Sequence, residues 1–187
     1  VMLLEIQSGK ESYAMEYLKG VFTPNSGDYV TAVDEKNIIV IKQMESTSDY
    51  EAVEETANMT VSIMNTEAMI NVKLAYGTIV SELKEVSKSY KEAKMALDVG
   101  KIFYAEKSVV AYGTLGIGRL IYQLPINLCE MFIEEIFGEK IPDELDEETL
   151  ITVNTFLDNN LNVSETARQL YVHRNTLLYR LEKLEKL

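Results

Sequence analysis

The stretch from Asn162 to Arg180 reads NVSETARQLYVHRNTLLYR, and its spacing predicts two short helices joined by a tight turn. Asn162 can cap the first helix, and Glu165, three residues further on, can reach back to it as in a capping box. Apolar residues then recur at i, i+4 and i+7, which is the spacing of one helix face. These residues are Val163, Ala167 and Leu170. The stretch therefore predicts a first helix that buries one narrow face.

A second helix is expected to begin near Arg174, after the apolar turn residue Val172. Its inward residues are Leu177, Leu181 and Leu184. Hydrogen-bond donors remain at its start and on its outer face, and donors of this kind read base edges and phosphates in a major groove. One further donor, Arg168, lies on the first helix. The candidate DNA-binding residues are thus Arg168, His173, Arg174, Asn175, Thr176, Tyr179, Arg180 and Lys183. The alternative interpretation is an α-hairpin with a solvated basic face.

Charge separates this segment from the rest of the chain. The protein has 18 basic and 30 acidic residues, so that nucleic acid is repelled on average. Residues 166–187 reverse the sign, because they hold five basic residues against two acidic ones. We expect DNA binding to be confined to this end and to depend strongly on salt.

Length and composition indicate a globular protein with one or two domains. The 187 residues are 47% hydrophobic, which is ample for a core. No apolar run is long enough to span a membrane, and the first residues do not form a signal peptide. The single cysteine, Cys129, excludes an internal disulfide and favours a cytoplasmic location. Because the chain opens at Val1 within an apolar run, we expect it to be a fragment of a longer protein.

The chain before residue 118 alternates strand and helix patterns. Strands are expected in residues 1–6, 29–33, 37–41, 70–76 and 108–111. Helices are expected in residues 11–21, 50–64 and 81–103, the last with Leu83, Val86, Tyr90, Ala93 and Leu97 on its inner face. The order predicts an α+β fold with helices on one or both faces of a mainly antiparallel sheet.

Helical patterns continue beyond this sheet. Leu120, Ile121 and Leu124 are followed by Pro125 at the first turn of a new helix, which carries Leu128, Phe132 and Ile136. Residues 138–145 form the expected linker. A further helix over residues 147–157 is expected to support the two C-terminal helices. Its packing face is predicted to be Leu150, Val153 and Leu157.

The run VSETARQLYVHRNTLLYRLEKLEKL resembles the C-terminal helix–turn–helix of the PucR/CdaR family of bacterial regulators of sugar-diacid and purine catabolism. The segments SYKEAKMAL and VVAYGTLGIGRLIYQLP are similar to the degenerate GGDEF-like domain that precedes this module in the same family. The resemblance implies a GGDEF-like, ferredoxin-like domain with trailing helices at residues 1–137. It implies a wingless helix–turn–helix, similar to that of the Fis protein, at residues 146–187. An effector would be sensed by an upstream region that is absent here.

Two positions depart from these patterns. Active diguanylate cyclases carry a Gly-Gly-Asp/Glu-Glu-Phe hairpin, whereas the corresponding hairpin here reads AVDEKNIIVI. Asp34 and Glu35 could bind a cation weakly, but an exposed turn is the better interpretation. Tyr171 stands where many helix–turn–helix turns place glycine, so the turn is expected to differ in shape from the repressor type.

The sequence does not favour phosphate-loop, metal or nucleophile chemistry. The glycines at 113, 116 and 118 lack the spacing of a phosphate-binding fingerprint. With one histidine, His173, and one cysteine, neither a multi-histidine metal site nor a Cys–His nucleophile is favoured. We expect no enzyme activity, no cofactor and no metal.

Two functions follow from the sequence. The first is a transcriptional regulator that binds double-stranded DNA as a homodimer, with the helices around Leu120 and Leu128 as a pairing surface or, equally, as a cover for the first core. The second is a nucleotide- or metabolite-binding module whose C-terminal helices contact proteins. The positive C-terminal segment favours the first.

Overall fold

The computed structural model describes residues 1–7, 9–46, 48–138 and 146–184. The chain divides into two compact units, Val1–Leu124 and Pro125–Leu187. No helix in the described ranges is long and apolar enough to cross a membrane. Most of the linker expected at residues 138–145 lies outside the described residues, so this domain boundary stays a prediction.

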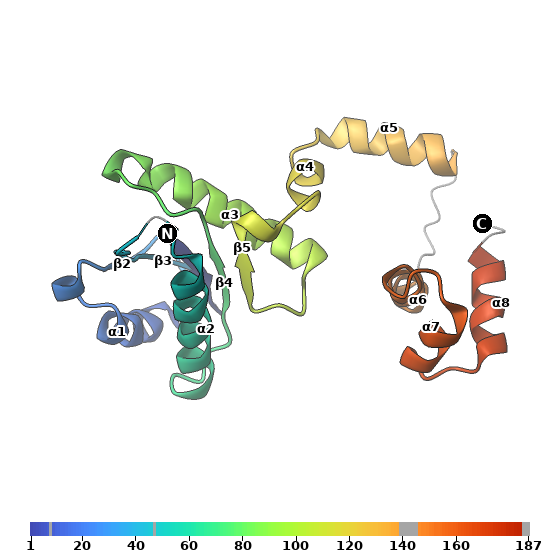
Figure 1. Cartoon of the computed structure of the whole chain (residues 1–187), viewed down its shortest axis with the longest axis horizontal. Coiled ribbons are helices and arrows are strands. Elements are labelled where there is room, and N and C mark those ends of the chain that lie inside the picture. Colours follow the sequence, from blue (N-terminus) through green and yellow to red (C-terminus); the bar gives the residue numbers. More distant parts are fainter. Residues whose placement is uncertain (8, 47, 139–145, 185–187) are drawn as a thin grey trace. The chain divides into compact units, whose positions relative to one another are not determined.

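The first unit is built on a five-stranded sheet in the order β2-β3-β1-β4-β5 (Figure 1). Its central strand β1 pairs antiparallel with both β3 and β4, and β4 pairs parallel with β5. The strands are β1 (Met2–Glu5), β2 (Tyr29–Ala32), β3 (Asn37–Ile41), β4 (Lys73–Tyr76) and β5 (Val109–Ala111). The expected mainly antiparallel sheet is therefore confirmed.

Helices cover both faces of this sheet. They are α1 (Glu11–Val21), α2 (Tyr50–Thr66) and α3 (Val86–Phe103). Side chains alternate along β1, so Met2 and Leu4 join the core that contains α1 and α2 residues, while Leu3 joins the core under α3. This double burial explains why β1 reads as an uninterrupted apolar run. The α+β class predicted from the sequence is confirmed.

Helix α3 lies unusually close to β4 at one point. A Cβ atom added to Gly77 would stand 2.0 Å from the backbone oxygen of Ser89 on α3. Thr78, the next residue, donates its backbone N–H to the Glu92 carboxylate at 2.9 Å and accepts a hydrogen bond from the Ser89 hydroxyl through its carbonyl at 2.7 Å. Glycine at 77 is thus required by the helix–strand distance.

The start of α3 differs from the sequence expectation. The sequence predicts a helix from residue 81 with Leu83 facing inward, but α3 begins at Val86 after a 3-10 turn, η2 (Leu83–Glu85). Leu83 is 86% exposed. The backbone of Glu82 is extended, with φ −123° and ψ 141°, so the apolar period does not continue back through this turn. The assignment of Leu83 to the inner face is therefore wrong.

Two helices follow the last strand, α4 (Gly118–Tyr122) within the first unit and α5 (Ile126–Phe137) within the second, with Pro125 at the N-cap of α5. Leu120 and Leu124 are 63% and 45% exposed. These side chains are thus not enclosed in the core of the first unit.

The C-terminal helices are α6 (Glu147–Asp158), α7 (Val163–Gln169) and α8 (Arg174–Leu184) (Figure 1). The predicted packing face of α6 is wrong, because Leu150 and Leu157 are 47% and 58% exposed. Thr152 is fully buried instead, and its hydroxyl donates to the Glu148 carbonyl at 2.8 Å. A threonine that satisfies its hydroxyl within its own helix can be buried without an unpaired polar group, which apolar spacing alone does not reveal.

Candidate nucleic-acid interface

The first helix of the candidate module, α7, begins at the cap that the sequence predicts. The Asn162 side-chain oxygen accepts hydrogen bonds from the backbone N–H groups of Ser164 and Glu165, both at 3.1 Å. The reciprocal half of the capping box is not formed, because the Asn162 N–H donates to the Asn159 carbonyl. Glu165 instead pairs with Arg168, whose guanidinium holds the pKa of this carboxyl below its usual range.

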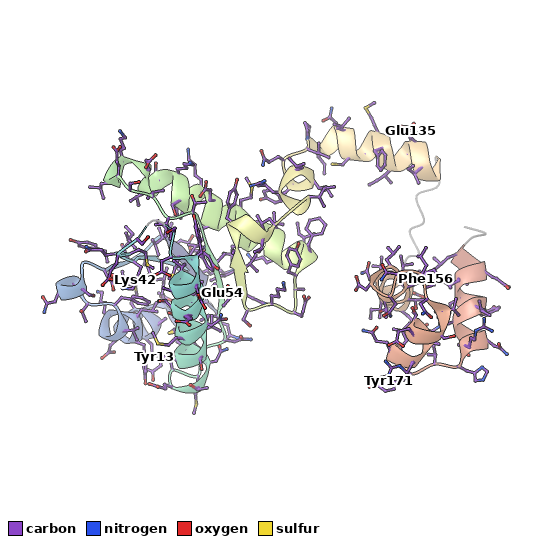
Figure 2. The ribbon with its side chains drawn as sticks, viewed as in Figure 1. Tyr13, Lys42, Glu54, Glu135, Phe156 and Tyr171 are labelled. Atoms are coloured by element: carbon purple, nitrogen blue, oxygen red, sulfur yellow. The ribbon has the colours of Figure 1, made fainter. Side chains whose placement is uncertain are left out.

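The turn between α7 and α8 is a Schellman motif. The Val172 N–H donates to the Ala167 carbonyl at 3.0 Å, and the Tyr171 N–H donates to the Arg168 carbonyl at 3.2 Å. Tyr171 takes the left-handed position with φ 54°, which glycine usually occupies. Its side chain is 96% exposed and is labelled at this turn in Figure 2. The difference in turn shape expected from Tyr171 stays a prediction, while α8 begins at Arg174 as the sequence predicts.

His173 caps the second helix. The backbone N–H of Asn175 donates to His173 Nδ1 at 3.3 Å, and the His173 carbonyl accepts from Thr176 at 2.9 Å. An imidazole nitrogen thus takes the place of the side-chain oxygen found at most N-caps. Sequence reasoning assigned His173 to DNA contact and missed this role. The capping role could have been predicted from the sequence, because His173 directly precedes Arg174, the first residue of the helix.

The inward face of α8 is as predicted. Leu177 is fully buried, and Leu181 and Leu184 are half-buried. Ala167 on α7 is 4% exposed. A small buried residue on one helix allows another helix to approach closely, which suits Ala167 to the packing of α7 beside α8.

Most of the predicted donors lie together in the first turn of α8 and on its outer face. His173, Arg174, Asn175 and Thr176 are all exposed, and so is Lys183 in the last turn. Tyr179 is 69% exposed. Exposed amide, hydroxyl and guanidinium donors at a helix start are the groups that a major groove can accept.

Two of the predicted residues are engaged within the helical unit. The Arg180 guanidinium bonds the Glu148 carboxylate at 2.5 Å and the Thr152 hydroxyl at 3.3 Å. Arg168 pairs with Glu165 on its own helix. Arg180 is therefore placed to hold α8 against α6, and its predicted DNA contact would require this pair to open or to be shared.

The hairpin between β2 and β3 is closed by its own acidic residue. Asp34 accepts hydrogen bonds from the backbone N–H of Lys36 at 2.8 Å and of Asn37 at 2.9 Å, and from the Asn37 amide. These bonds, led by that from Lys36, hold the pKa of the carboxyl below its usual range. Within the ranges that the structure describes, no group of three His, Cys, Asp or Glu residues could hold a metal ion. The hydrogen bonds from Lys36 and Asn37 make Asp34 part of the turn.

Family models match both parts of this architecture. Residues 1–99 match the GGDEF-like domain, and residues 149–187 match the PucR C-terminal helix-turn-helix domain.

Curated relatives extend the comparison. The purine catabolism regulatory protein of Bacillus subtilis is 30% identical over 117 residues, which are 62% of this chain and 22% of the relative. The DNA-binding transcriptional activator AdeR of the same organism is 22% identical over 172 residues, which are 84% of this chain and 39% of the relative. The chain thus spans well under half the length of these two relatives.

A solved structure is also similar to this chain. It is the regulator of polyketide synthase expression from Bifidobacterium adolescentis, with 17% identity and a TM-score of 0.46 over 97% of this chain and 69% of that one. The GGDEF-like model alone covers more than half of the present sequence, and the second model covers its C-terminal helices. The chain belongs to the family of proteins that join a GGDEF-like domain to a PucR C-terminal helix-turn-helix domain.

Proposed function

We propose that this protein is a DNA-binding transcriptional regulator of the PucR/CdaR type, in which the first turn of α8 reads the major groove. The observation that carries the proposal is the exposed run His173–Thr176, which forms the start of a helix that is anchored one turn later by the fully buried Leu177. A fixed helix with a free N-terminal turn can present its donors at one angle to the base edges. Two relatives named as regulators support the same function.

Within this proposal the donors divide into two roles. Arg174 and Asn175 stand at the helix start, where bidentate contacts to guanine or adenine are possible. Lys183 and Tyr179 lie further along the outer face and suit phosphate contacts. Arg168 and Arg180, which are ion-paired, would contribute mainly to the local field. The regulator would bind as a homodimer in the cytoplasm and respond to an effector that this chain does not identify.

The test is binding of a labelled promoter fragment at two salt concentrations. Arg174→Ala and Asn175→Ala should each weaken specific binding by about 1–3 kcal/mol. Lys183→Ala should weaken binding to all sequences alike and reduce the salt slope by about one. Lys88→Ala on α3 is the matched control, because it removes the same charge from an exposed site in the other unit. Unchanged binding by all three module variants would place the reading surface elsewhere.

We further propose that the GGDEF-like unit makes no cyclic dinucleotide. The hairpin lacks paired glycines, and the Asp34 carboxylate is already bonded to three donors of its own turn. Incubation with GTP and magnesium or manganese should therefore give no product by chromatography. Product that disappears in an Asp34→Ala variant would contradict the proposal.

One observation favours the alternative of a metabolite-binding module. A cavity of about 490 Å³ lies at the end of the sheet near Ile41, Gln43 and Val86, a volume in the range of small-molecule sites. The Lys42 ammonium in its wall is tied to the buried Asp28 at 3.1 Å, which leaves this cation partly neutralised. Equilibrium dialysis with nucleotides and dicarboxylates, in the absence of DNA, would distinguish a ligand site from an empty groove.

A further inference from the structure

Helix α5 has two halves that differ in chemistry. With about 3.6 residues per turn, its apolar residues other than Met131 share one half of the circumference. This half, called here the apolar half, consists of Ile126, Leu128, Cys129, Phe132, Ile133 and Ile136. The opposite half carries Asn127, Glu130, Glu134 and Glu135, together with Met131. Helices with this division usually bury the apolar half against another element.

The apolar half is open in the structure. Ile126, Phe132 and Ile136 are 75%, 63% and 60% exposed, and Leu128 and Ile133 are 46% and 37% exposed. With roughly 100 Å² of accessible surface on each, these five side chains present about 500 Å², close to the largest apolar patch of a typical monomer. Two such surfaces placed together would bury about 1,000 Å², the area from which a specific interface becomes stable.

The distribution of charge indicates what covers this surface. The apolar half contains no charged residue, while the other half is acidic on a chain with a net charge of −12. A basic partner would be attracted to the acidic half and would leave the apolar half exposed. A second copy, by contrast, can bury both apolar halves and keep both acidic halves in water, where their repulsion is screened.

We propose that the apolar half of α5 pairs with the same half of α5 in a second copy of this chain. The proposal rests on the proposed function for its purpose, since paired α5 helices would bring two helix–turn–helix modules to one operator. Residues 138–146 join α5 to α6, and at ~3.5 Å per residue they can reach at most about 30 Å. Two such connections can serve half-sites about 34 Å apart.

The deciding experiment compares two glutamate variants of the full chain by sedimentation without DNA. Ile136 and Met131 are 60% and 62% exposed, yet they stand about 140° apart around the helix. Ile136→Glu buries a carboxylate from each copy in the apolar contact, and the dimer dissociation constant should rise roughly a hundredfold. Met131→Glu adds the same charge outside the contact and should change the constant by less than about twofold.

A cross-link supplies an independent readout. Cys129 lies in the apolar half and is the only cysteine of the chain. A short bismaleimide should therefore join two wild-type chains through Cys129, and the cross-linked product should be lost in Ile136→Glu but kept in Met131→Glu. Circular dichroism should show the same helix content in both variants, because neither side chain is buried within its own chain.

Three results would overturn the pairing: a wild-type monomer at tens of micromolar, equal dissociation by both variants, or dimers unaffected by either. The proposed DNA function is measured separately on the promoter fragment. A wild-type dimer that ignores DNA would contradict that function and leave the α5 pairing intact. A wild-type monomer that binds DNA would contradict the α5 pairing and leave the proposed DNA function intact.

Discussion

The sheet unit and the C-terminal helices are stabilised in different ways. The sheet unit buries apolar side chains on both faces of β1, in two separate clusters. Among the described residues of α6, α7 and α8, the buried side chains are those of Thr152, Thr166, Ala167 and Leu177. With so small a core, the helical module must draw on caps, turn geometry and ion pairs. The exposed surface of α8 is therefore held by its cap, by the turn before it and by the ion pair of Arg180 with Glu148, more than by core packing.

The largest difference should appear when one buried leucine is removed from each unit. Leu74→Ala and Leu177→Ala both truncate a fully buried side chain, and each should cost about 2–5 kcal/mol. The sheet unit has other core residues and should remain folded with a lower melting temperature. The helical module should unfold, because Leu177 is its only large side chain that is fully buried in the described ranges.

Calorimetry on both variants would measure this difference. Leu177→Ala should remove the transition of the helices and leave that of the sheet unit in place. A single transition that moves equally in both variants would show that the two units share one cooperative core.

The cap of α8 offers a smaller and more selective change. His173→Ala removes the acceptor for the Asn175 N–H and should destabilise the module by about 1 kcal/mol, while His173→Asn should restore the cap. DNA affinity should follow stability if His173 acts as a cap. Should His173→Asn be stable but fail to bind DNA, the imidazole itself contacts DNA.

The turn before α8 should respond in the opposite direction. Tyr171 adopts a left-handed φ of 54° with its side chain 96% exposed, so Tyr171→Gly relieves backbone strain and loses little packing. We expect the module to gain about 0.5–1 kcal/mol in thermal unfolding. Tyr171→Ala is the control, since alanine keeps the strain. Equal stability of the glycine and alanine variants would show that the turn is unstrained.

The smallest effect concerns acid. Asp146 caps α6, and hydrogen bonds from Thr149, with smaller contributions from the charges of Lys183 and Arg180, hold its pKa below the ordinary 3.8. Because the pKa is lowered in the folded state, the ionised Asp146 contributes fully to stability above pH 3.8. This contribution is lost as the pH falls through the lower pKa of the folded state. Asp146→Asn keeps a cap that does not titrate, so its melting temperature should fall less than that of the wild type below pH 4. Parallel melting curves against pH would contradict this assignment.

The sequence predicted the features that depend on neighbouring residues. Three such features are the apolar run of β1, the cap at Asn162 and the inward position of Leu177. They follow from the spacing of apolar residues and from capping chemistry, which act over a few positions. The exposure of Leu83 was missed because a 3-10 turn interrupts the helical period. The packing face of α6 was missed because Thr152 satisfies its hydroxyl inside its own helix and can be buried in place of a leucine.

The candidate site shows the same limit. The clustering of exposed donors at the start of α8 could be predicted, since it follows from the position of Arg174 after the turn. The ion pair of Arg180 with Glu148 could not, because it joins residues far apart in sequence. It depends on how α6 and α8 pack, which no local pattern determines.

Titration of the isotope-labelled chain with a promoter duplex, followed by amide nuclear magnetic resonance, tests the central claim most directly. The account predicts that the largest shift changes fall on His173–Thr176, with smaller ones at Tyr179 and Lys183, and that the amides of the sheet unit stay in place. Shift changes centred on the sheet unit would contradict this account. So would the absence of shift changes at DNA concentrations that saturate binding in the promoter-fragment assay.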